Sequence, residues 1–319
     1  MNLPLWRPML ACRAEPFDSP DYLFEVKWDG YRCLAYLEKT KTTLRSRNLR
    51  DLSPLFPELQ KLHDMVVGWP AILDGEIVIM QKGKPSFAAL QKRNQSQNAF
   101  KIERLSLEMP AVYVVFDILL WRGRPVLWEK IENRKELLAG ILRKDAYLCL
   151  SEFITGDGTA FFDACAAKGL EGIMAKKLGS PYLPGKRSAY WKKIRTSRSA
   201  DLVICGYQPG RGRRTLGSLL LCAWDGKGYV YQGRVGTGFT SDMEKELIKL
   251  LNQITIKEMP LRFRSPESQN VIWVEPVLVC TVEYTETTED GLLRHPSFKG
   301  FRFDKAPREC TPAASNVCR

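Results

Sequence analysis

The pattern of the sequence changes near residue 200, and this change limits the possible folds more than any other feature. Before it, short β-rich runs alternate with helical runs. After Asp201, nine glycines fall between Gly206 and Gly238 and separate short strand-like runs. The 319 residues are enough for two domains that each bury a core. We therefore expect two domains, residues 1–197 and residues 198–319.

The first domain is expected to have a mixed α+β fold. Its strand-like runs follow one another through turns of two to five residues, which favours a largely antiparallel sheet over a series of βαβ crossovers. The runs that predict strands are 24–30, 33–38, 42–47, 71–80, 113–120 and 147–153, and those that predict helices are 131–144 and 159–169.

The second domain is expected to be a small closed barrel. Its strand-like runs are 202–208, 218–224, 229–236 and 271–286, with one helix at 241–254. Short strands, glycine turns and one helix fit an OB-fold, with an SH3-like barrel as the competing fold. A capping box from Ser241 to Glu244 is expected to begin the helix. Its apolar face would consist of Met243, Leu247, Leu250, Leu251 and Ile254.

The charge of the chain predicts a polyanionic partner. There are 48 Lys and Arg against 36 Asp and Glu, a net charge of +12, of which +9 lies in the first 197 residues. Such an excess attracts nucleic acid. No apolar run is long enough to cross a membrane, and the N-terminus does not resemble a leader, so we expect a soluble cytoplasmic protein with no membrane partner.

The few histidines and scattered cysteines restrict the chemistry. Only His63 and His295 are present, and the nine cysteines include no C-x-x-C pair. This argues against a histidine triad, a zinc site and a disulfide framework, and for a reducing compartment. An enzyme of this composition must work with Lys, Arg and carboxylates.

The run Phe24 to Gly30 combines acids with a lysine. Period-two alternation would place Glu25, Lys27 and Asp29 on one face of a strand, so that the lysine lies between two carboxylates. By itself the pattern also fits an exposed polar face of a sheet.

Several acids interrupt apolar runs. Asp74 and Glu76 break the run 71–80, Asp117 lies among apolar neighbours, and Glu171 lies where a helix passes into a strand. A buried carboxylate needs a cation, a hydrogen-bond donor or a metal. Each acid alone could equally be a capped turn or a paired core residue.

A basic run with aromatic residues lies between residues 173 and 198. It contains no acid and includes Tyr182, Tyr190 and Trp191, which suits phosphate binding, although such runs also occur on solvated surfaces. No complete P-loop or G-x-G-x-x-G motif is present, so a nucleotide would be bound by side chains on strands. The basic residues are Lys176, Lys177, Lys186, Arg187, Lys192, Lys193, Arg195 and Arg198, and Arg211, Arg213 and Arg214 continue the basic sequence.

Six short motifs occur in the order found in one superfamily. KWDGYR (27–32) resembles the K-x-D-G-x-R signature of covalent nucleotidyltransferases, the polynucleotide ligases and messenger-RNA capping enzymes. The other five are LDGE (73–76), VVFDIL (114–119), EGIMAK (171–176), WKKIR (191–195) and RFDK (302–305). Within the superfamily, SRN (46–48), FAALQKR (87–93), GRVGTGF (233–239) and RHPSFKGFRFDK (294–305) resemble the bacterial ATP-dependent DNA ligases associated with end joining.

The resemblance implies a minimal two-domain DNA ligase: a nucleotidyltransferase domain followed by an OB-fold. Lys27 would attack the α-phosphate of ATP to form lysyl-AMP. AMP would then pass to the 5′-phosphate of a nick, and the 3′-hydroxyl would displace it. A lysine of ordinary pKa, about 10.4, is a poor nucleophile at neutral pH, so nearby cations and Mg²⁺, which Mn²⁺ could replace, must favour the neutral amine. The partners would be nicked or broken double-stranded DNA and end-joining proteins, and the protein would be a bacterial, nucleoid-associated monomer.

The resemblance also assigns roles to individual residues. Arg195 departs from the lysine that many family members have, and a planar guanidinium is not equivalent to an ammonium. A mobile linker is expected at Thr196 to Ala200. Metal and ribose would be held by Glu76 and Glu171, adenine by Phe116 and Glu25, ribose or phosphate by Arg32 and Arg47, phosphates by Lys176, Lys193 and Arg195, and pyrophosphate by Asp304 and Lys305 of the second domain.

Three other functions remain open at this point. A capping guanylyltransferase shares the lysine chemistry but uses GTP, and an RNA ligase shares it with a different acceptor. The C-terminal string at 294–305 favours a DNA ligase over both. A non-catalytic nucleic-acid-binding protein would use the basic run and barrel alone, but every candidate catalytic residue is present, which argues against it.

Overall fold

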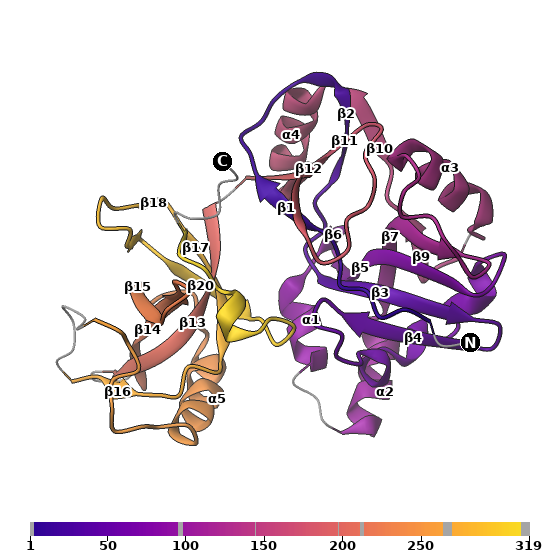
Figure 1. Cartoon of the computed structure of the whole chain (residues 1–319). Coiled ribbons are helices and arrows are strands. Elements are labelled where there is room, and N and C mark those ends of the chain that lie inside the picture. Colours follow the sequence, from indigo (N-terminus) through magenta and orange to yellow (C-terminus); the bar gives the residue numbers. More distant parts are fainter. Residues whose placement is uncertain are drawn as a thin grey trace. The chain divides into compact units, whose positions relative to one another are not determined.

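The computed structural model describes residues 3–94, 98–143, 145–196, 198–210, 214–263 and 270–313. These residues form two compact units, and the boundary between them follows Thr196 (Figure 1). We call the N-terminal part unit 1 and the C-terminal part unit 2. None of the helices in the described ranges has the length and apolar character that a membrane span requires.

Unit 1 contains two sheets. The first has five strands in the order β1-β12-β11-β2-β10. Its strands are β1 (Leu10–Arg13), β2 (Ser19–Val26), β10 (Phe153–Gly156), β11 (Gly172–Lys177) and β12 (Arg187–Arg195).

The second sheet of unit 1 has seven strands. Its main path is β4-β3-β5-β7-β8, with β6 paired to β5 and β9 paired to β7. The strands are β3 (Tyr31–Glu38), β4 (Lys41–Ser46), β5 (Ala71–Gln81), β6 (Lys84–Pro85), β7 (Ala111–Trp121), β8 (Arg124–Pro125) and β9 (Leu148–Leu150).

Most strand pairs in unit 1 are antiparallel. The exceptions among the described strands are β1 with β12 and β7 with β9, which are parallel. The expectation of a mixed, largely antiparallel domain is therefore confirmed. The expected strand 147–153 is wrong as one element, because it is divided between β9 and β10, which belong to different sheets.

Period-two alternation gives each sheet two different faces. One face of the five-stranded sheet packs on helix α4 (Gly158–Ala167) through Phe24, Ile173 and Ile194. On the opposite face lie Glu25, Lys176 and other polar residues, and this face meets the seven-stranded sheet in a shared cluster. The cluster contains Met9, Leu34, Tyr36, Ile72, Phe116, Leu119, Leu120, Leu127, Tyr182 and Trp191. Arg32 and Lys176 contact this cluster through the rings of Phe116 and Trp191.

The other face of the seven-stranded sheet packs on helices and 3-10 turns. Its core includes Ala89 and Leu90 of one helix and Leu138 and Ile141 of another. The helices of unit 1 besides α4 are α1 (Phe87–Asn94), α2 (Ala99–Glu108) and α3 (Ile131–Ile141), and the 3-10 turns are η1 (Ser53–Leu55), η2 (Pro57–Leu59) and η3 (Leu62–Met65).

The sequence patterns did not predict α1 and α2. The side chain of Asn98 caps α2 by accepting hydrogen bonds from the backbone N–H groups of Phe100 and Lys101. Phe100 and Leu107 are exposed on α2, while Ile102 and Leu105 are buried. Large apolar residues on both faces of the helix hide its amphipathic period in the sequence.

Unit 2 is built on a six-stranded antiparallel sheet. The path is β15-β14-β13-β17-β20, with β16 also paired to β13, and a separate pair joins β18 to β19. The elements are β13 (Arg198–Pro209), β14 (Leu216–Trp224), β15 (Tyr229–Val235), α5 (Ser241–Asn252), β16 (Ile272–Trp273), β17 (Val279–Tyr284), β18 (Glu286–Thr287), β19 (Leu293–Arg294), β20 (Ser297–Phe301) and η4 (Pro307–Glu309).

Two expectations about unit 2 need correction. The run 271–286 is not one strand, because residues between β16 and β17 leave the sheet. Helix α5 is capped by Thr240 and not by Ser241, since the Thr240 side chain accepts from the backbone N–H of Met243. Leu247 and Leu251 are buried in the core as expected, whereas Leu250 is 38% exposed.

The expected linker is wrong for its last three residues. Arg198, Ser199 and Ala200 belong to β13 and pair with β17. These three residues are in the sheet because β13 is a long strand, Arg198–Pro209, whose first half pairs with β17. Ser197 lies outside the described residues.

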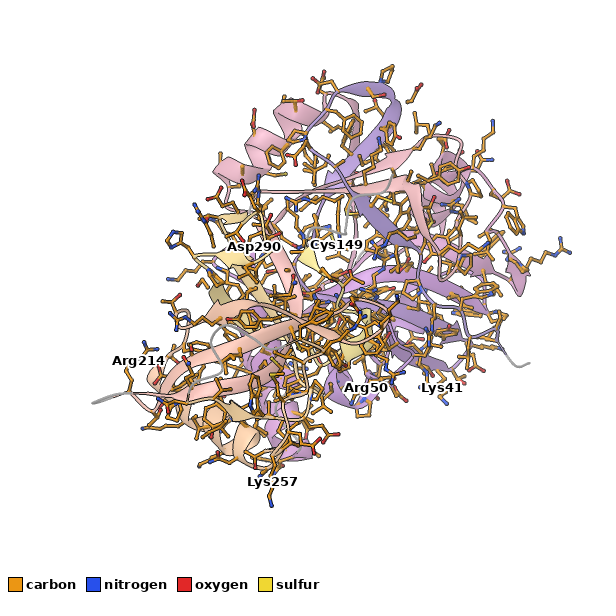
Figure 2. The ribbon with its side chains drawn as sticks, turned by 60° about the vertical axis from the view of Figure 1, so that its left-hand side comes forward. Lys41, Arg50, Cys149, Arg214, Lys257 and Asp290 are labelled. Carbon is orange, nitrogen blue, oxygen red and sulfur yellow. The ribbon has the colours of Figure 1, made fainter. Side chains whose placement is uncertain are left out.

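Among the described residues, seven cysteines are free thiols. Cys12 is nevertheless disulfide-bonded. Cys149 is exposed (Figure 2), and the other free cysteines are buried. The free cysteines are Cys33, Cys149, Cys165, Cys205, Cys222, Cys280 and Cys310.

Candidate active site

Lys27 lies directly after Val26, the last residue of β2 in the five-stranded sheet. Its backbone N–H donates to the carbonyl oxygen of Gly172, with an N–O distance of 2.9 Å. Its ammonium forms an ion pair with a carboxylate oxygen of Glu171. Both side chains are less than one-fifth exposed. Since β2 ends at Val26, Lys27 is a loop residue and not part of the strand predicted at 24–30.

Gly172 allows the close strand packing that places Glu171 beside Lys27. It has φ +140°, and a Cβ at this position would lie 2.0 Å from the carbonyl oxygen of Ile194. Only glycine fits both the backbone angle and the space. The sequence placed Glu171 just before a strand, and the structure begins β11 at the following residue.

Arg195 and Lys193 lie on β12 at alternate positions. Arg195 Nε lies 3.1 Å from the second carboxylate oxygen of Glu171. In the β11–β12 pairing, Gly172 is opposite Arg195 and Met174 is opposite Lys193. Because residues two apart on a strand share a face, Lys193 and Arg195 lie on the face that also carries Trp191.

Glu76 lies beside the loop that Lys27 begins. A Cβ at Gly30 would be 2.9 Å from Glu76 Cγ and 2.2 Å from the carbonyl oxygen of Ile77, so the loop packs closely on β5. Glu171 therefore lies beside the Lys27 end of this loop, and Glu76 lies beside its Gly30 end.

Glu25 is buried between two lysines. It is 1% exposed, and its oxygens form ion pairs with Lys135 and with Lys176, the latter at 2.8 Å. Lys135 comes from helix α3 and also donates to the carbonyl oxygen of Ser151 at 3.3 Å. The interpretation of residues 24–30 as an exposed polar face is therefore wrong for Glu25.

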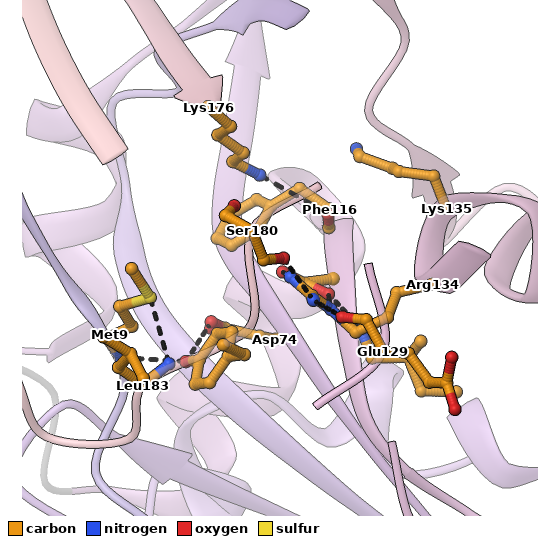
Figure 3. Close-up of polar contacts among 12 residues, drawn as sticks. Met9, Asp74, Phe116, Glu129, Arg134, Lys135, Lys176, Ser180 and Leu183 are labelled. Atoms are coloured by element: carbon orange, nitrogen blue, oxygen red, sulfur yellow. Dashed lines mark hydrogen bonds and ion pairs between the residues drawn. The ribbon is translucent and has the colours of Figure 1, made fainter. Parts of the chain in front are cut away.

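The Lys176 ammonium lies on two aromatic rings. Its Nζ is 4.5 Å from the ring centre of Phe116 and 4.4 Å from that of Trp191, and it donates to the Phe116 carbonyl oxygen (Figure 3). Burial lowers the pKa of Lys176 to about 8, although the Glu25 carboxylate raises it. Lys176 is therefore a buried cation, paired with Glu25, on the face where the two sheets meet.

Arg32 and Asp74 form a bidentate pair on the same face. Arg32 Nε and Nη2 donate to the two oxygens of Asp74 at 2.6 and 2.5 Å. The guanidinium carbon lies 4.5 Å from the ring centre of Phe116. Burial lowers the pKa of Arg32, but the charge and hydrogen bonds of Asp74 outweigh it, and the pKa is raised above its ordinary value.

Asp117 and Arg134 form a second buried bidentate pair, with donor–acceptor distances of 2.7 and 2.9 Å. Burial raises the pKa of Asp117, but the charge and hydrogen bonds of Arg134 lower it by more. The pKa of Asp117 is therefore below its ordinary value. Arg134 also donates to the carbonyl oxygens of Glu129 and Ser180 (Figure 3). Asp74 and Asp117 are thus paired core acids, which was one of the two interpretations that the sequence left open.

Three further sequence-predicted residues have partners or neighbours of their own. Arg47 follows β4, is half-buried, and helps to lower the pKa of Arg187, for which burial is the larger cause. In unit 2, Asp304 is buried in a bidentate pair with Arg302, at 2.8 Å for both contacts. Lys305 Nζ lies 2.8 Å from a carboxylate oxygen of Asp201.

The basic run has several structural environments. Lys176 is buried, and Lys192 Nζ lies 4.6 Å from the ring centre of Phe17 on the opposite face of β12. Arg214, which is labelled in Figure 2, pairs with Glu244 at 3.0 Å in unit 2. Arg211 and Arg213 lie outside the described residues. Only part of the run is therefore a solvated basic surface, with Lys177, Lys186, Arg187 and Arg198 exposed.

Sequence reasoning missed Lys135 and Asp201, which pair with the predicted site residues Glu25 and Lys305, and Arg134, which pairs with Asp117. Lys135 and Arg134 occur in a helical run with ordinary surface composition, so the sequence carries no signal for their burial. Asp201 is the first acid after the basic run, and its place before an apolar strand was the available signal.

A metal would have to be held with the help of a substrate. Within the described parts of the chain, no group of three or more His, Cys, Asp or Glu could hold a metal ion. Mg²⁺ is commonly bound by one or two carboxylates together with substrate phosphates. Glu76 and Glu171, which flank the Lys27 loop, fit that donor set.

Comparisons with known proteins identify the family. The structure is similar to a solved structure described as mycobacterial DNA ligase D complexed with ATP and MES, with a TM-score of 0.66, 31% identity, and coverage of 96% of this chain and 98% of that one. The ligase domain of Mycobacterium tuberculosis LigD matches with a TM-score of 0.51 and 32% identity, over 96% of this chain and 98% of that one. The chain therefore has a nucleotidyltransferase-type ligase fold.

The sequence comparisons agree. The family model described as "ATP dependent DNA ligase domain" matches residues 8–195, and "ATP dependent DNA ligase C terminal region" matches residues 212–305. The chain belongs to the ATP-dependent DNA ligases, which are enzymes. It is 34% identical over 310 residues to "Multifunctional non-homologous end joining DNA repair protein LigD" of Mycobacterium tuberculosis, covering 95% of this chain and 39% of the relative. The chain thus spans well under half the length of that relative.

Proposed function

We propose that this chain joins 3′-hydroxyl and 5′-phosphate ends in double-stranded DNA through AMP carried on Lys27, in repair of breaks by end joining. The observation that carries the proposal is the position of Lys27. Its backbone is fixed by the bond to Gly172, and its ammonium lies beside the Glu171 carboxylate, with Arg195 on the other oxygen of that carboxylate.

In the first reaction, Lys27 Nζ would attack the α-phosphorus of ATP. The N–P bond forms, the bond from phosphorus to the bridging oxygen breaks, pyrophosphate leaves, and the amine loses a proton. Arg195, which lies beside Glu171, and Lys193, which shares its face of β12, would neutralise charge on the phosphates. The AMP would then move to a DNA 5′-phosphate and be displaced by a 3′-hydroxyl.

The face where the two sheets meet would hold the nucleotide. Phe116 offers an aromatic ring for the adenine base, and Glu25 offers a carboxylate held by two lysines. Arg32, Arg47 and Lys176 supply cations for ribose or phosphate. The buried ion pairs of Glu25, Arg32 and Lys176 fix these three side chains before the nucleotide arrives, which reduces the ordering cost of binding.

Glu76 and Glu171 would hold Mg²⁺ or Mn²⁺ together with phosphate oxygens. The metal supplies charge neutralisation for phosphoryl transfer. Glu171 contacts Lys27 as well, so it would serve both the nucleophile and the metal.

The two units would have separate roles. Residues 1–197 would form the adenylation domain, and residues 198–319 an OB-fold that contacts DNA. Asp304 and Lys305 would orient pyrophosphate during the first reaction. The partners would be nicked or broken DNA and end-joining proteins of a bacterial cytoplasm, where the enzyme would act near the nucleoid as a monomer.

Mass spectrometry of the intact protein tests this function. After incubation with ATP and Mg²⁺, the protein should gain the mass of one AMP, and peptide mapping should locate it on Lys27. Lys168→Ala, at an exposed lysine after α4, is the matched control and should label like the wild type. An adduct on another lysine, or better labelling with GTP than with ATP, would contradict the proposal.

A further inference from the structure

The connection between β11 and β12 carries a tyrosine that none of the site assignments includes. Tyr182 is 0% exposed, and its ring packs edge-on against Trp191 with centroids 5.5 Å apart. Its backbone N–H donates to the carbonyl oxygen of Leu127 at 2.8 Å. The tyrosine thus spans the core where the two sheets of unit 1 meet.

The Tyr182 hydroxyl contacts the acid that holds Arg32. It donates to Asp74 Oδ2 at 2.6 Å, and the same oxygen accepts from Arg32 Nη2 at 2.5 Å. The other Asp74 oxygen accepts from Arg32 Nε. The Asp74 carboxylate therefore accepts three hydrogen bonds. Its Oδ2 atom accepts two of them, one from Arg32 and one from the Tyr182 hydroxyl.

We propose that Tyr182 is a positioning residue for nucleotide binding, because its hydroxyl orients Asp74 and so holds the Arg32 guanidinium in place over the Phe116 ring. The inference rests on the proposed function, in which Arg32 and Phe116 contact ATP. Tyr182 itself need not touch the nucleotide.

The surroundings of the hydroxyl leave it one direction in which to donate. The backbone N–H of Met9 donates to the Tyr182 oxygen at 2.9 Å, so the hydroxyl hydrogen is directed to Asp74. Burial, and then the nearby Asp74 charge, raise the pKa of Tyr182 well above its ordinary value, which keeps the hydroxyl protonated. The backbone N–H of Leu183 donates to the Met9 sulfur at 3.2 Å (Figure 3). The N-terminal segment thereby holds the tyrosine in register with Asp74.

Tyr182→Phe tests the proposal, because it removes one hydroxyl and leaves the ring. Tyr113→Phe is the matched control: Tyr113 is also fully buried, and its hydroxyl donates to the carbonyl oxygens of Cys33 and Leu73 on the opposite face of the same strands. Both variants lose a buried hydroxyl next to β3 and β5, but only Tyr182 contacts Asp74.

The first measurement is the dissociation constant of ATP by calorimetry, with Lys27→Ala present in every protein so that no covalent step follows binding. Tyr182→Phe should weaken ATP binding by about tenfold, the value of one hydrogen bond to a charged group. Tyr113→Phe should lower the Tm at least as much and leave the dissociation constant within twofold. Equal dissociation constants for Tyr182→Phe and its parent would overturn the inference.

The second measurement is a double-mutant cycle with Asp74→Asn. If Tyr182 acts through Asp74, Tyr182→Phe should change ATP affinity little once Asp74→Asn is present. Full additivity of the two changes would overturn the route through Asp74. If the affinities change as expected but the protein with intact Lys27 gains no covalent AMP, the proposed function is wrong and the role of Tyr182 in nucleotide binding stands.

Discussion

Replacing Gly172 by alanine should be among the most damaging single changes near Lys27. A Cβ there would lie 2.0 Å from the Ile194 carbonyl oxygen and 2.8 Å from Arg195 Cα, where real Cβ contacts are essentially never below 3.0 Å. The strands must therefore separate by about 1 Å. In addition, φ is +140°, and such backbone strain costs roughly 1–3 kcal/mol for a residue with a side chain.

Displacing the Glu171–Gly172 backbone from Ile194 would also disrupt the hydrogen bonds that this backbone makes to the segments on both of its sides. The Lys27 N–H to Gly172 oxygen bond is 2.9 Å, and the Thr196 N–H to Glu171 oxygen bond is 3.0 Å. Each contributes about 1 kcal/mol. Strain and lost bonds together should lower the free energy of unfolding by about 3–5 kcal/mol, a large share of the 5–15 kcal/mol typical of a domain.

Urea unfolding followed by circular dichroism measures this effect, with two glycine controls. Gly179 has φ +72°, and a Cβ added there would have no heavy atom within 4 Å, so Gly179→Ala isolates backbone strain and should cost about 1–2 kcal/mol. Gly140 lies in helix α3 with open space around it, so Gly140→Ala should stabilise by about 0.5–1 kcal/mol.

Labelling of Lys27 with AMP provides the functional measurement for the same variants. Gly172→Ala should label far more slowly than wild type at a temperature where it remains folded, because Lys27 and Glu171 lose their relative placement. If Gly172→Ala and Gly179→Ala differ by less than about 1 kcal/mol, close strand approach is not the reason for glycine at this position.

Three further predictions concern the steps, the salt dependence and the pH dependence. Lys305→Ala should stop self-adenylylation yet still seal a nick whose 5′ end already carries AMP, whereas Glu171→Ala should impair both reactions. Gel assays on nicked and pre-adenylated substrates measure this. Sealing of the pre-adenylated nick by Glu171→Ala at the wild-type rate would contradict the assignment. Nick binding, measured by fluorescence anisotropy, should weaken steeply as salt rises, and salt-insensitive binding would contradict the basic surface at 173–198. Burial lowers the pKa of Lys176 to about 8 from 10.5, so the unfolded state binds more protons between these values and the free energy of unfolding should rise with pH across that window. Urea unfolding at several pH values should show this rise relative to Lys176→Met, and parallel curves would refute it.

The sequence was most informative where a period of two or an unusual residue marked the chain. Alternation in the run that begins at Phe24 correctly put Glu25 on the face opposite Phe24, because successive side chains on a strand point to opposite sides, although the strand ends at Val26, before Lys27. Acids inside apolar runs are costly unless they are paired, so Asp74 and Asp117 stood out. Glycines and short strands after residue 200 indicated a domain of different architecture.

The sequence was less informative at element ends and on surface-like helices. The cap of helix α5 lies one residue before the expected cap because both Thr240 and Ser241 are good capping residues, and only the backbone geometry selects between them. Helix α2 was missed because Phe100 and Leu107 are apolar and exposed. Local sequence does not distinguish such residues from core residues.

By itself, the sequence determined the alternating strand faces, the mixed and largely antiparallel sheets of the first part, and the ordered set of motifs that marks an ATP-dependent DNA ligase. These follow from local rules: side-chain period, turn chemistry and short-range spacing. Only the tertiary structure decided which cations meet which acids. Lys135 reaches Glu25 across 110 positions of sequence, and Tyr182 reaches Asp74 across 108. Such pairs form because burial makes every uncompensated charge or donor costly, and the fold, not the local pattern, brings their partners within reach.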